Sequence, residues 1–187
     1  MTLYNIALFL HIVGALIMGS AQVLEQVGVG RIRQAKTTQD LGTVLGFVRP
    51  LSGLYQLSGA FILLSGIYLS IVAWGAEAWI IVSLAVVLVL AISGPRVSGV
   101  RFREIGQRAA AEDGALSAGL RSLTHAPILE WSHYLRMGAF LGIVLLMVTK
   151  PGLVGSLLVV VGALVVAGAF SLLRSSGSEE LQPAAAP

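Results

Sequence analysis

One histidine, His11, lies in the apolar stretch "LFLHIVGA" near the start of the chain. An imidazole can carry a proton, ligate a metal or haem iron, or form hydrogen bonds between helices. Polar groups inside a membrane are costly and usually face the interior of a helix bundle. If this stretch spans a membrane, His11 lies too deep to reach the surface. We therefore expect it to bind a ligand or to form a hydrogen bond within the bundle.

A second group of polar side chains is expected near one end of three membrane segments, with Gln22 and Glu25 closing the first segment. Ionisable groups at this depth are candidate functional residues. The sequence predicts a shared polar cavity open to the cytoplasm. Its candidate residues are Arg49, Ser52, Tyr55, Gln56, Glu130, Tyr134 and Arg136. The alternative is that these side chains anchor the helix ends at the interface, with Arg136 reaching the headgroups.

His11 and His133 are the candidate cofactor-binding residues. At a rise of 1.5 Å per residue, His11 lies roughly 20 Å and His133 roughly 9 Å from the inner ends of their segments. This mismatch disfavours a simple bis-histidine haem, so a haem on His11 would be five-coordinate or would use another ligand. The chain has no cysteine, and we predict no metal site because only histidine and methionine would remain as soft ligands.

The composition places these residues in a membrane. Of the 187 residues, 56% are hydrophobic and 11% are charged, whereas a soluble domain has about 25% charged residues. The formal charge of +3 fits basic loops near anionic lipid better than nucleic-acid binding. No Ser/His/Asp arrangement, carboxylate pair or phosphate-binding loop stands out, so no catalytic residue is predicted.

The chain has five hydrophobic segments that are long enough to cross a bilayer as helices. We predict an all-α polytopic transmembrane bundle over residues 1–174, in which four spans form a four-helix bundle and a fifth is added. A polar, partly helical loop at 95–126 is expected before the fourth span. Thr38 and Asp40 offer N-caps for a short helix after the first span. Residues 175–187 are expected to form a disordered tail. The expected spans are about 3–24, 50–75, 77–94, 127–149 and 152–173.

The basic residues predict the orientation. All of the 12 lysines and arginines except Lys150 fall on one side of the predicted topology. Because basic loops stay on the cytoplasmic side, we expect the N-terminus outside and the C-terminus in the cytoplasm. The protein is then a multi-pass protein of the inner (plasma) membrane of a bacterium.

Small residues recur on helical faces of several spans. The face of His11 carries Gly14 and Gly19, the second span carries Gly59 and Gly66, and the last span carries Gly155 and Gly162. Small residues allow close helix approach in lipid. These stripes predict tight packing within the bundle, and they also offer surfaces for a homo-oligomer or another membrane protein.

The segments "LFLHIVGALIMGS" and "GRIRQAKTTQDLGTVLGFVRPLSGLYQLSGAFILLSGIYL" resemble a bacterial family of small predicted integral membrane proteins known as a domain of unknown function. More distantly, the layout is similar to HemJ-type protoporphyrinogen oxidases and to the CopD-type copper-resistance membrane domain. Both have an early histidine in the first span. The HemJ likeness implies that His11 binds haem b. The chain has no counterpart of the lysine-bearing segment of that family, which argues against oxidase activity.

Three functions follow as hypotheses. The first is an integral membrane protein that binds haem b, or is associated with redox chemistry, through His11. The second is a non-catalytic accessory or assembly subunit of a membrane complex that packs through its glycine stripes. The third is a small transporter that uses the polar cavity.

Overall fold

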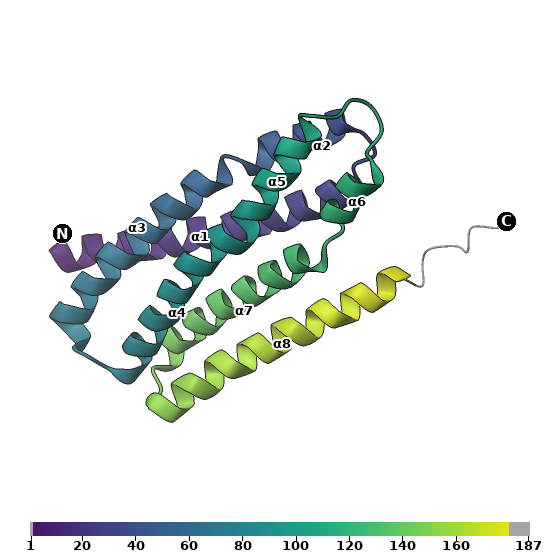
Figure 1. The fold of residues 1–187 in the computed structure, drawn as a ribbon. Coiled ribbons are helices and arrows are strands. Elements are labelled where there is room, and N and C mark those ends of the chain that lie inside the picture. Colours follow the sequence, from purple (N-terminus) through teal and green to yellow (C-terminus); the bar gives the residue numbers. More distant parts are fainter. Residues whose placement is uncertain (1, 180–187) are drawn as a thin grey trace.

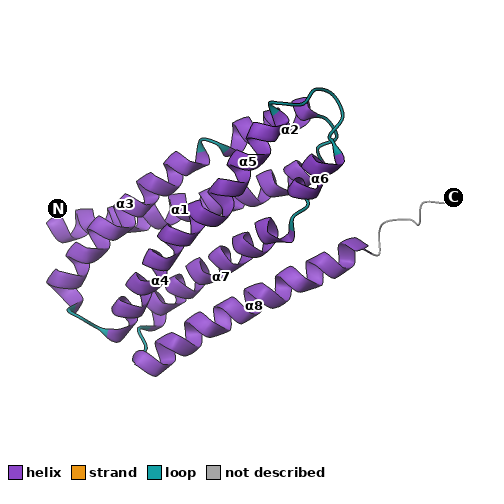
Figure 2. Ribbon diagram, viewed as in Figure 1, coloured by secondary structure: helices purple, strands orange, loops and turns teal. Residues whose placement is uncertain are grey.

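The computed structural model describes residues 2–179, with side chains placed for residues 2–173. Within this part, every named secondary-structure element is a helix (Figure 2). Five helical segments are long and apolar enough to cross a membrane, which confirms the predicted number of spans in the described chain. The elements are α1 Leu3–Gln34, α2 Thr38–Val48, α3 Leu51–Leu69, η1 Ser70–Trp74, α4 Ala78–Gly94, η2 Pro95–Gly99, α5 Val100–Ala109, α6 Ala118–Thr124, α7 Pro127–Thr149 and α8 Leu153–Glu179.

Prolines and one glycine set most of the breaks between these elements. Pro50 separates α2 from α3, and Pro127 occupies the first turn of α7, where its missing N–H costs nothing. Gly75 ends η1 with a φ of +69°, a conformation that glycine adopts readily. Pro95 does not stop the third span but opens the π-helical turn η2, which leads directly into α5.

The predicted loop 95–126 is therefore largely helical. The helical path that begins with α4 continues through η2 and α5 to Ala109, and α6 follows after a short connection. The cap of α2 also differs from expectation by one residue. Thr37, not Thr38, is the N-cap, and it forms a capping box with Asp40, because its extended backbone directs the hydroxyl to the Asp40 N–H.

The five membrane segments form two close pairs, which meet where α1 contacts α7, and α4 packs on the second pair. The long helix α1 packs along α3, α7 packs along α8, and α4 lies against α7 and α8, while α1 also contacts α7 (Figure 1). This arrangement differs from a four-helix bundle with an added fifth span, since α8 is a full packing partner of α7. The helix α8 packs closely on α7 because glycines and alanines line the contact between them.

Glycines allow the closest approaches between the helices. A Cβ on Gly138 of α7 would lie 2.5 Å from the Ala167 Cβ and 2.8 Å from the Ala163 oxygen of α8. A Cβ on Gly14 of α1 would lie 2.9 Å from the Phe61 Cβ of α3. These glycines are therefore used for packing inside the chain.

Two glycines of the predicted stripes are not used in this way. A Cβ on Gly59 or Gly162 would have nothing within 4 Å. Packing against another protein or a second copy stays a prediction for these two positions.

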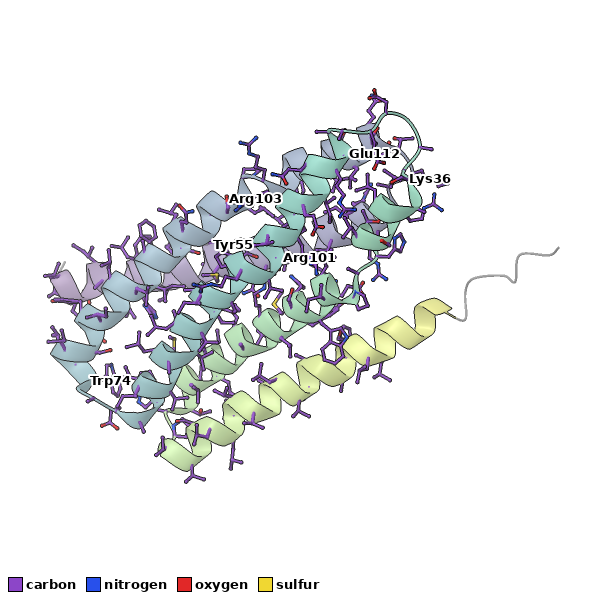
Figure 3. The ribbon with its side chains drawn as sticks, in the orientation of Figure 1. Lys36, Tyr55, Trp74, Arg101, Arg103 and Glu112 are labelled. Atoms are coloured by element: carbon purple, nitrogen blue, oxygen red, sulfur yellow. The ribbon has the colours of Figure 1, made fainter. Side chains whose placement is uncertain are left out.

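A small apolar core lies at the end of the molecule where α1 stops and α2, α5 and α6 meet. We call this end the basic end. In Figure 3, Lys36 and Glu112 mark it, and Trp74 lies at the opposite end. Buried residues of this core are Val29, Ile32, Leu41, Ile105, Leu116, Leu120 and Leu129. The core fixes the end of α1 against the start of α7.

The end of the chain falls partly outside the described residues. The helix α8 continues to Glu179, so residues 175–179 of the predicted tail are helical. The rest of that tail, 180–187, lies outside the described residues.

Candidate functional site

A buried carboxylate forms the centre of the polar side chains near the basic end. Glu25 of α1 is only 3% exposed. One of its oxygens accepts a hydrogen bond from Arg136 Nη2 of α7 at 2.6 Å, and the other accepts one from the Tyr55 hydroxyl of α3. Three helices thus meet at one carboxylate. We call this group the Glu25 cluster.

Helical spacing brings further polar residues to the same place. On α1, Gln22, Glu25 and Gln26 share a face because residues three and four apart are neighbours on a helix. The Gln26 amide nitrogen donates to the Tyr134 hydroxyl of α7 at 2.8 Å. Tyr134 follows His133, which is 1% exposed and lies within electrostatic reach of Glu25. The facing surfaces of α1 and α7 are therefore polar at this level.

A second ion pair joins the same two helices nearer the basic end. Arg33 of α1 pairs with Glu130 of α7, and their side chains are 27% and 15% exposed. In both this pair and the pair of Glu25 and Arg136, a glutamate of one helix faces an arginine of the other. The two ion pairs therefore add no net charge between α1 and α7. Replacing one member of such a pair would leave a charge without compensation.

Three buried polar atoms in this region have no hydrogen-bond partner among the described residues. They are Gln22 Oε1, Gln26 Oε1 and His133 Nδ1. Buried polar atoms in folded proteins are almost always hydrogen-bonded, and each exception calls for an explanation such as bound water, an ion or a functional role. These atoms could form hydrogen bonds that no other described residue supplies.

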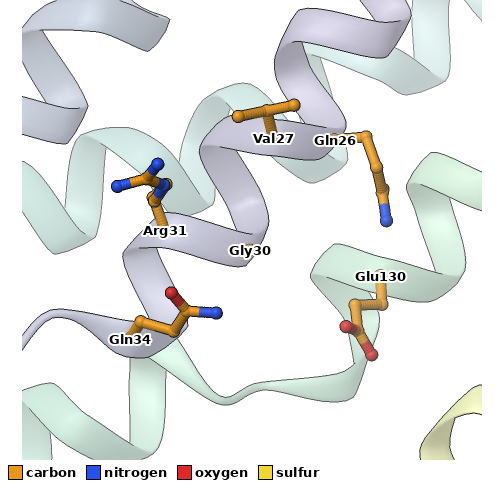
Figure 4. Close-up of a pocket in the computed structure, with 6 residues that line it drawn as sticks. All are labelled: Gln26, Val27, Gly30, Arg31, Gln34 and Glu130. Carbon is orange, nitrogen blue, oxygen red and sulfur yellow. The ribbon is translucent and has the colours of Figure 1, made fainter.

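An open pocket of about 220 Å³ lies beside this region at the basic end (Figure 4). Gln26 and Gln34 of α1 and Glu130 of α7 are among its lining residues. Gln26 therefore belongs both to the pocket wall and to the hydrogen bond with Tyr134. The pocket therefore opens beside the polar surfaces of α1 and α7, and Gln22, Glu25 and His133 are not among its lining residues.

The residues predicted to line a shared cavity divide into two groups. Tyr55, Glu130, Tyr134 and Arg136 belong to the polar contacts between helices. The other predicted residues are exposed and lie in or just before α3, and they are Arg49, Ser52 and Gln56. Because the face of α3 that packs on α1 carries Tyr55 and Ser58, Gln56 is turned away from it.

Glu25 is the central residue of the site, and the sequence alone does not single it out as a cavity or cofactor residue. The sequence does contain an indication of this role, because a glutamate follows the apolar first segment within a few residues of Gln22. A carboxylate at that position reads equally well as the polar end of a membrane helix. Only the convergence of α1, α3 and α7 identifies it as buried and doubly bonded.

His11 lies apart from the Glu25 cluster, against α3. Its Nδ1 is 3.1 Å from the Ile62 carbonyl oxygen and 3.1 Å from the Ser65 hydroxyl. Ser65 donates its own proton to the Phe61 carbonyl, and a carbonyl can only accept. Nδ1 therefore carries a proton and donates it to the Ile62 carbonyl. Nε2 has no hydrogen-bond partner among the described residues.

The two candidate haem ligands are held in different places. His11 contacts α3, and a Cβ on Gly66 would lie 3.0 Å from its Cε1 atom. His133 is enclosed near Glu25 and Arg136, and Glu25 follows His11 on α1 by about 21 Å of helix axis. If haem bound at His11, Nε2 would be the ring nitrogen left to ligate its iron, because Nδ1 is hydrogen-bonded to α3. His133 does not fit as its axial partner.

Comparison with known proteins gives one result. The family model described as "Predicted integral membrane protein (DUF2269)" matches residues 5–151, from the first turn of α1 to just past the end of α7. No curated protein and no solved structure matches the chain significantly.

Proposed function

The chain belongs to the DUF2269 family of predicted integral membrane proteins, and on that premise we propose that it is a small transporter for neutral polar solutes. The binding site is the region around the Glu25 cluster. The observation that carries this proposal is the set of buried atoms without protein partners, Gln22 Oε1, Gln26 Oε1 and His133 Nδ1. A network with a purely structural role would be expected to satisfy its own polar atoms.

The charges of the region favour a neutral solute. Glu25 is compensated by Arg136 and Glu130 by Arg33, so an added ion would face no unpaired opposite charge. The unused groups are amide oxygens and an imidazole nitrogen, which suit hydroxyl, amide or water ligands. The solute would enter through the pocket at the basic end. With the orientation expected from the basic residues, this entrance faces the cytoplasm.

Solute flux into proteoliposomes tests the proposal. Vesicles that contain the full chain are mixed with hyperosmotic glycerol or urea, and re-swelling is followed by stopped-flow light scattering. We expect faster re-swelling than in protein-free vesicles for at least one of the two probes. Gln22→Leu, which removes a buried amide, should abolish the difference.

Gln56→Leu is the matched control, because it removes the same amide from an exposed position on α3. It should leave the flux unchanged. Equal rates for the protein and the protein-free vesicles with both probes would refute the proposal. Equal loss of flux in both glutamine variants would also refute it, since the buried amide would then have no special role.

A second candidate function is haem b binding at His11, the redox-associated role implied by the HemJ likeness. The hydrogen bond from His11 Nδ1 to the Ile62 carbonyl favours it, because histidine ligands commonly donate their other ring N–H to such a group. Haem would supply one-electron chemistry. The purified protein, expressed with ample haem, should show a Soret band that shifts on reduction and disappears in His11→Ala. His125→Ala, an exposed histidine, should keep the band. A colourless protein would refute this role.

A further inference from the structure

A second cavity lies between α4, α7 and α8, separate from the pocket at the basic end. Its volume is about 580 Å³, within the range of small-molecule sites, roughly 300–1,000 Å³. Its walls are mainly apolar, and Ala85, Val89, Trp131 and Leu164 are among its lining residues. We call it the α4–α7–α8 crevice. An apolar ligand, or the apolar part of one, would suit these walls.

One charged side chain reaches this crevice. Arg136 lines it together with Gly94 and Ser132. The Arg136 Nη2 donates to Glu25 and its Nε donates to the Ser132 carbonyl. Its Nη1 has no hydrogen-bond partner among the described residues, and it would lie 3.6 Å from a Cβ on Gly94. A guanidinium N–H donor is thus available at the wall of an apolar crevice.

From this placement we propose that the α4–α7–α8 crevice binds a neutral amphiphile of the quinone class, with its apolar part along the crevice and a carbonyl oxygen accepting from Arg136 Nη1. The missing side chain of Gly94 leaves room beside that nitrogen. The charge of Arg136 is already compensated by Glu25. A neutral acceptor therefore completes its hydrogen bonds without adding an unpaired charge.

The depth of Arg136 in the membrane favours such a neutral ligand over a phospholipid. Arg136 precedes the end of α7 at Thr149 by about 20 Å of helix axis, so it lies on the order of 10 Å inside a hydrocarbon core of about 30 Å. A phosphate headgroup would have to leave the interface to reach it, at a high desolvation cost. A neutral carbonyl group can enter this depth, and it gains a charge-assisted hydrogen bond there.

Fluorescence of Trp131 tests the proposal directly, because this side chain lines the crevice. The chain has three tryptophans, so Trp74→Phe with Trp79→Phe leaves Trp131 as the only reporter. The full chain with these two changes is placed in phosphatidylcholine nanodiscs and titrated with decylubiquinone. We expect quenching that saturates.

Two further variants and one control connect the quenching to the crevice. Ala85→Phe fills it from α4 and should abolish the saturable quenching. Arg136→Lys keeps a positive charge near Glu25 but lacks the guanidinium fork, and it should weaken binding by about tenfold, the loss of one hydrogen bond to a charged group. Ala60→Phe, on an exposed position of α3 outside the crevice, should bind normally. Circular dichroism of each variant shows that it is folded.

Two results would overturn the proposal. The first is quenching that rises in proportion to decylubiquinone and is equal in folded Ala85→Phe and Ala60→Phe, because the quinone would then only partition into the bilayer. The second is loss of saturable quenching when phosphatidylglycerol replaces part of the phosphatidylcholine. The crevice would then be an anionic-lipid site.

Discussion

The pair of Glu25 and Arg136 allows a quantitative prediction of stability. We consider Glu25→Leu, which replaces the buried carboxylate by an apolar side chain of similar size. Glu25 is 3% and the Arg136 side chain is 15% exposed, so the remaining guanidinium charge would be left largely out of water. Breaking a buried pair by removing one partner costs about 3–5 kcal/mol. The Tyr55 hydroxyl also loses its acceptor. We expect the free energy of unfolding to fall by that amount.

The double variant Glu25→Leu/Arg136→Leu separates charge from packing. Neither charge remains buried in it, and replacing a whole buried pair by apolar side chains is often close to neutral. We therefore expect the double variant to be more stable than Glu25→Leu alone. The difference between the single and double variants measures the cost of the uncompensated guanidinium.

Glu104→Leu is the control for loss of a glutamate at the surface. Glu104 is 33% exposed and pairs with Arg101 and Arg108 on α5, so its loss should cost about 0–1 kcal/mol. Unfolding is followed by far-UV circular dichroism as the fraction of sodium dodecyl sulfate in mixed micelles increases. If Glu25→Leu costs no more than Glu104→Leu, or if the double variant is less stable than the single one, the reasoning is refuted.

Three other substitutions have defined outcomes. Gly138→Val should cost about 1–3 kcal/mol in the same unfolding assay, because its side chain would overlap Ala163 of α8; an unchanged midpoint would mean that α7 and α8 are not closely packed in the membrane. Thr37→Ala should cost about 1 kcal/mol and speed amide exchange at the start of α2, because it removes the capping box with Asp40; unchanged exchange would contradict this role. Ile105→Ala removes a side chain that is 0% exposed and should destabilise the apolar core of the basic end by about 2–5 kcal/mol. Faster proteolysis between α5 and α6 measures that loss, and an unchanged cleavage rate would show that the core does not hold these helices.

The number of membrane segments could be predicted because it depends on a property that each segment has by itself. About 20 consecutive apolar residues satisfy the length of the hydrocarbon core regardless of their neighbours. Helix ends were less predictable. Pro95 reads as a stop in the sequence, yet the chain passes it through the π-helical turn η2 and continues as α5. Proline removes one backbone hydrogen bond of a helix, and the turn η2 that carries Pro95 packs against α7, a contact that the local sequence does not specify.

The membrane class of this protein, its five spans and the gathering of polar residues toward one end of them can all be inferred without a structure. Those properties follow from composition, segment length and helical spacing. The tertiary structure alone decided which polar residues meet. Tyr55 and Gln56 are neighbours in the sequence, but only Tyr55 faces Glu25, because the rotation of α3 is set by its contact with α1 at Gly14 and Gly66. The pairing of Glu25 with Arg136 joins residues 111 positions apart. Such a pairing depends on how helices pack, which local patterns do not specify.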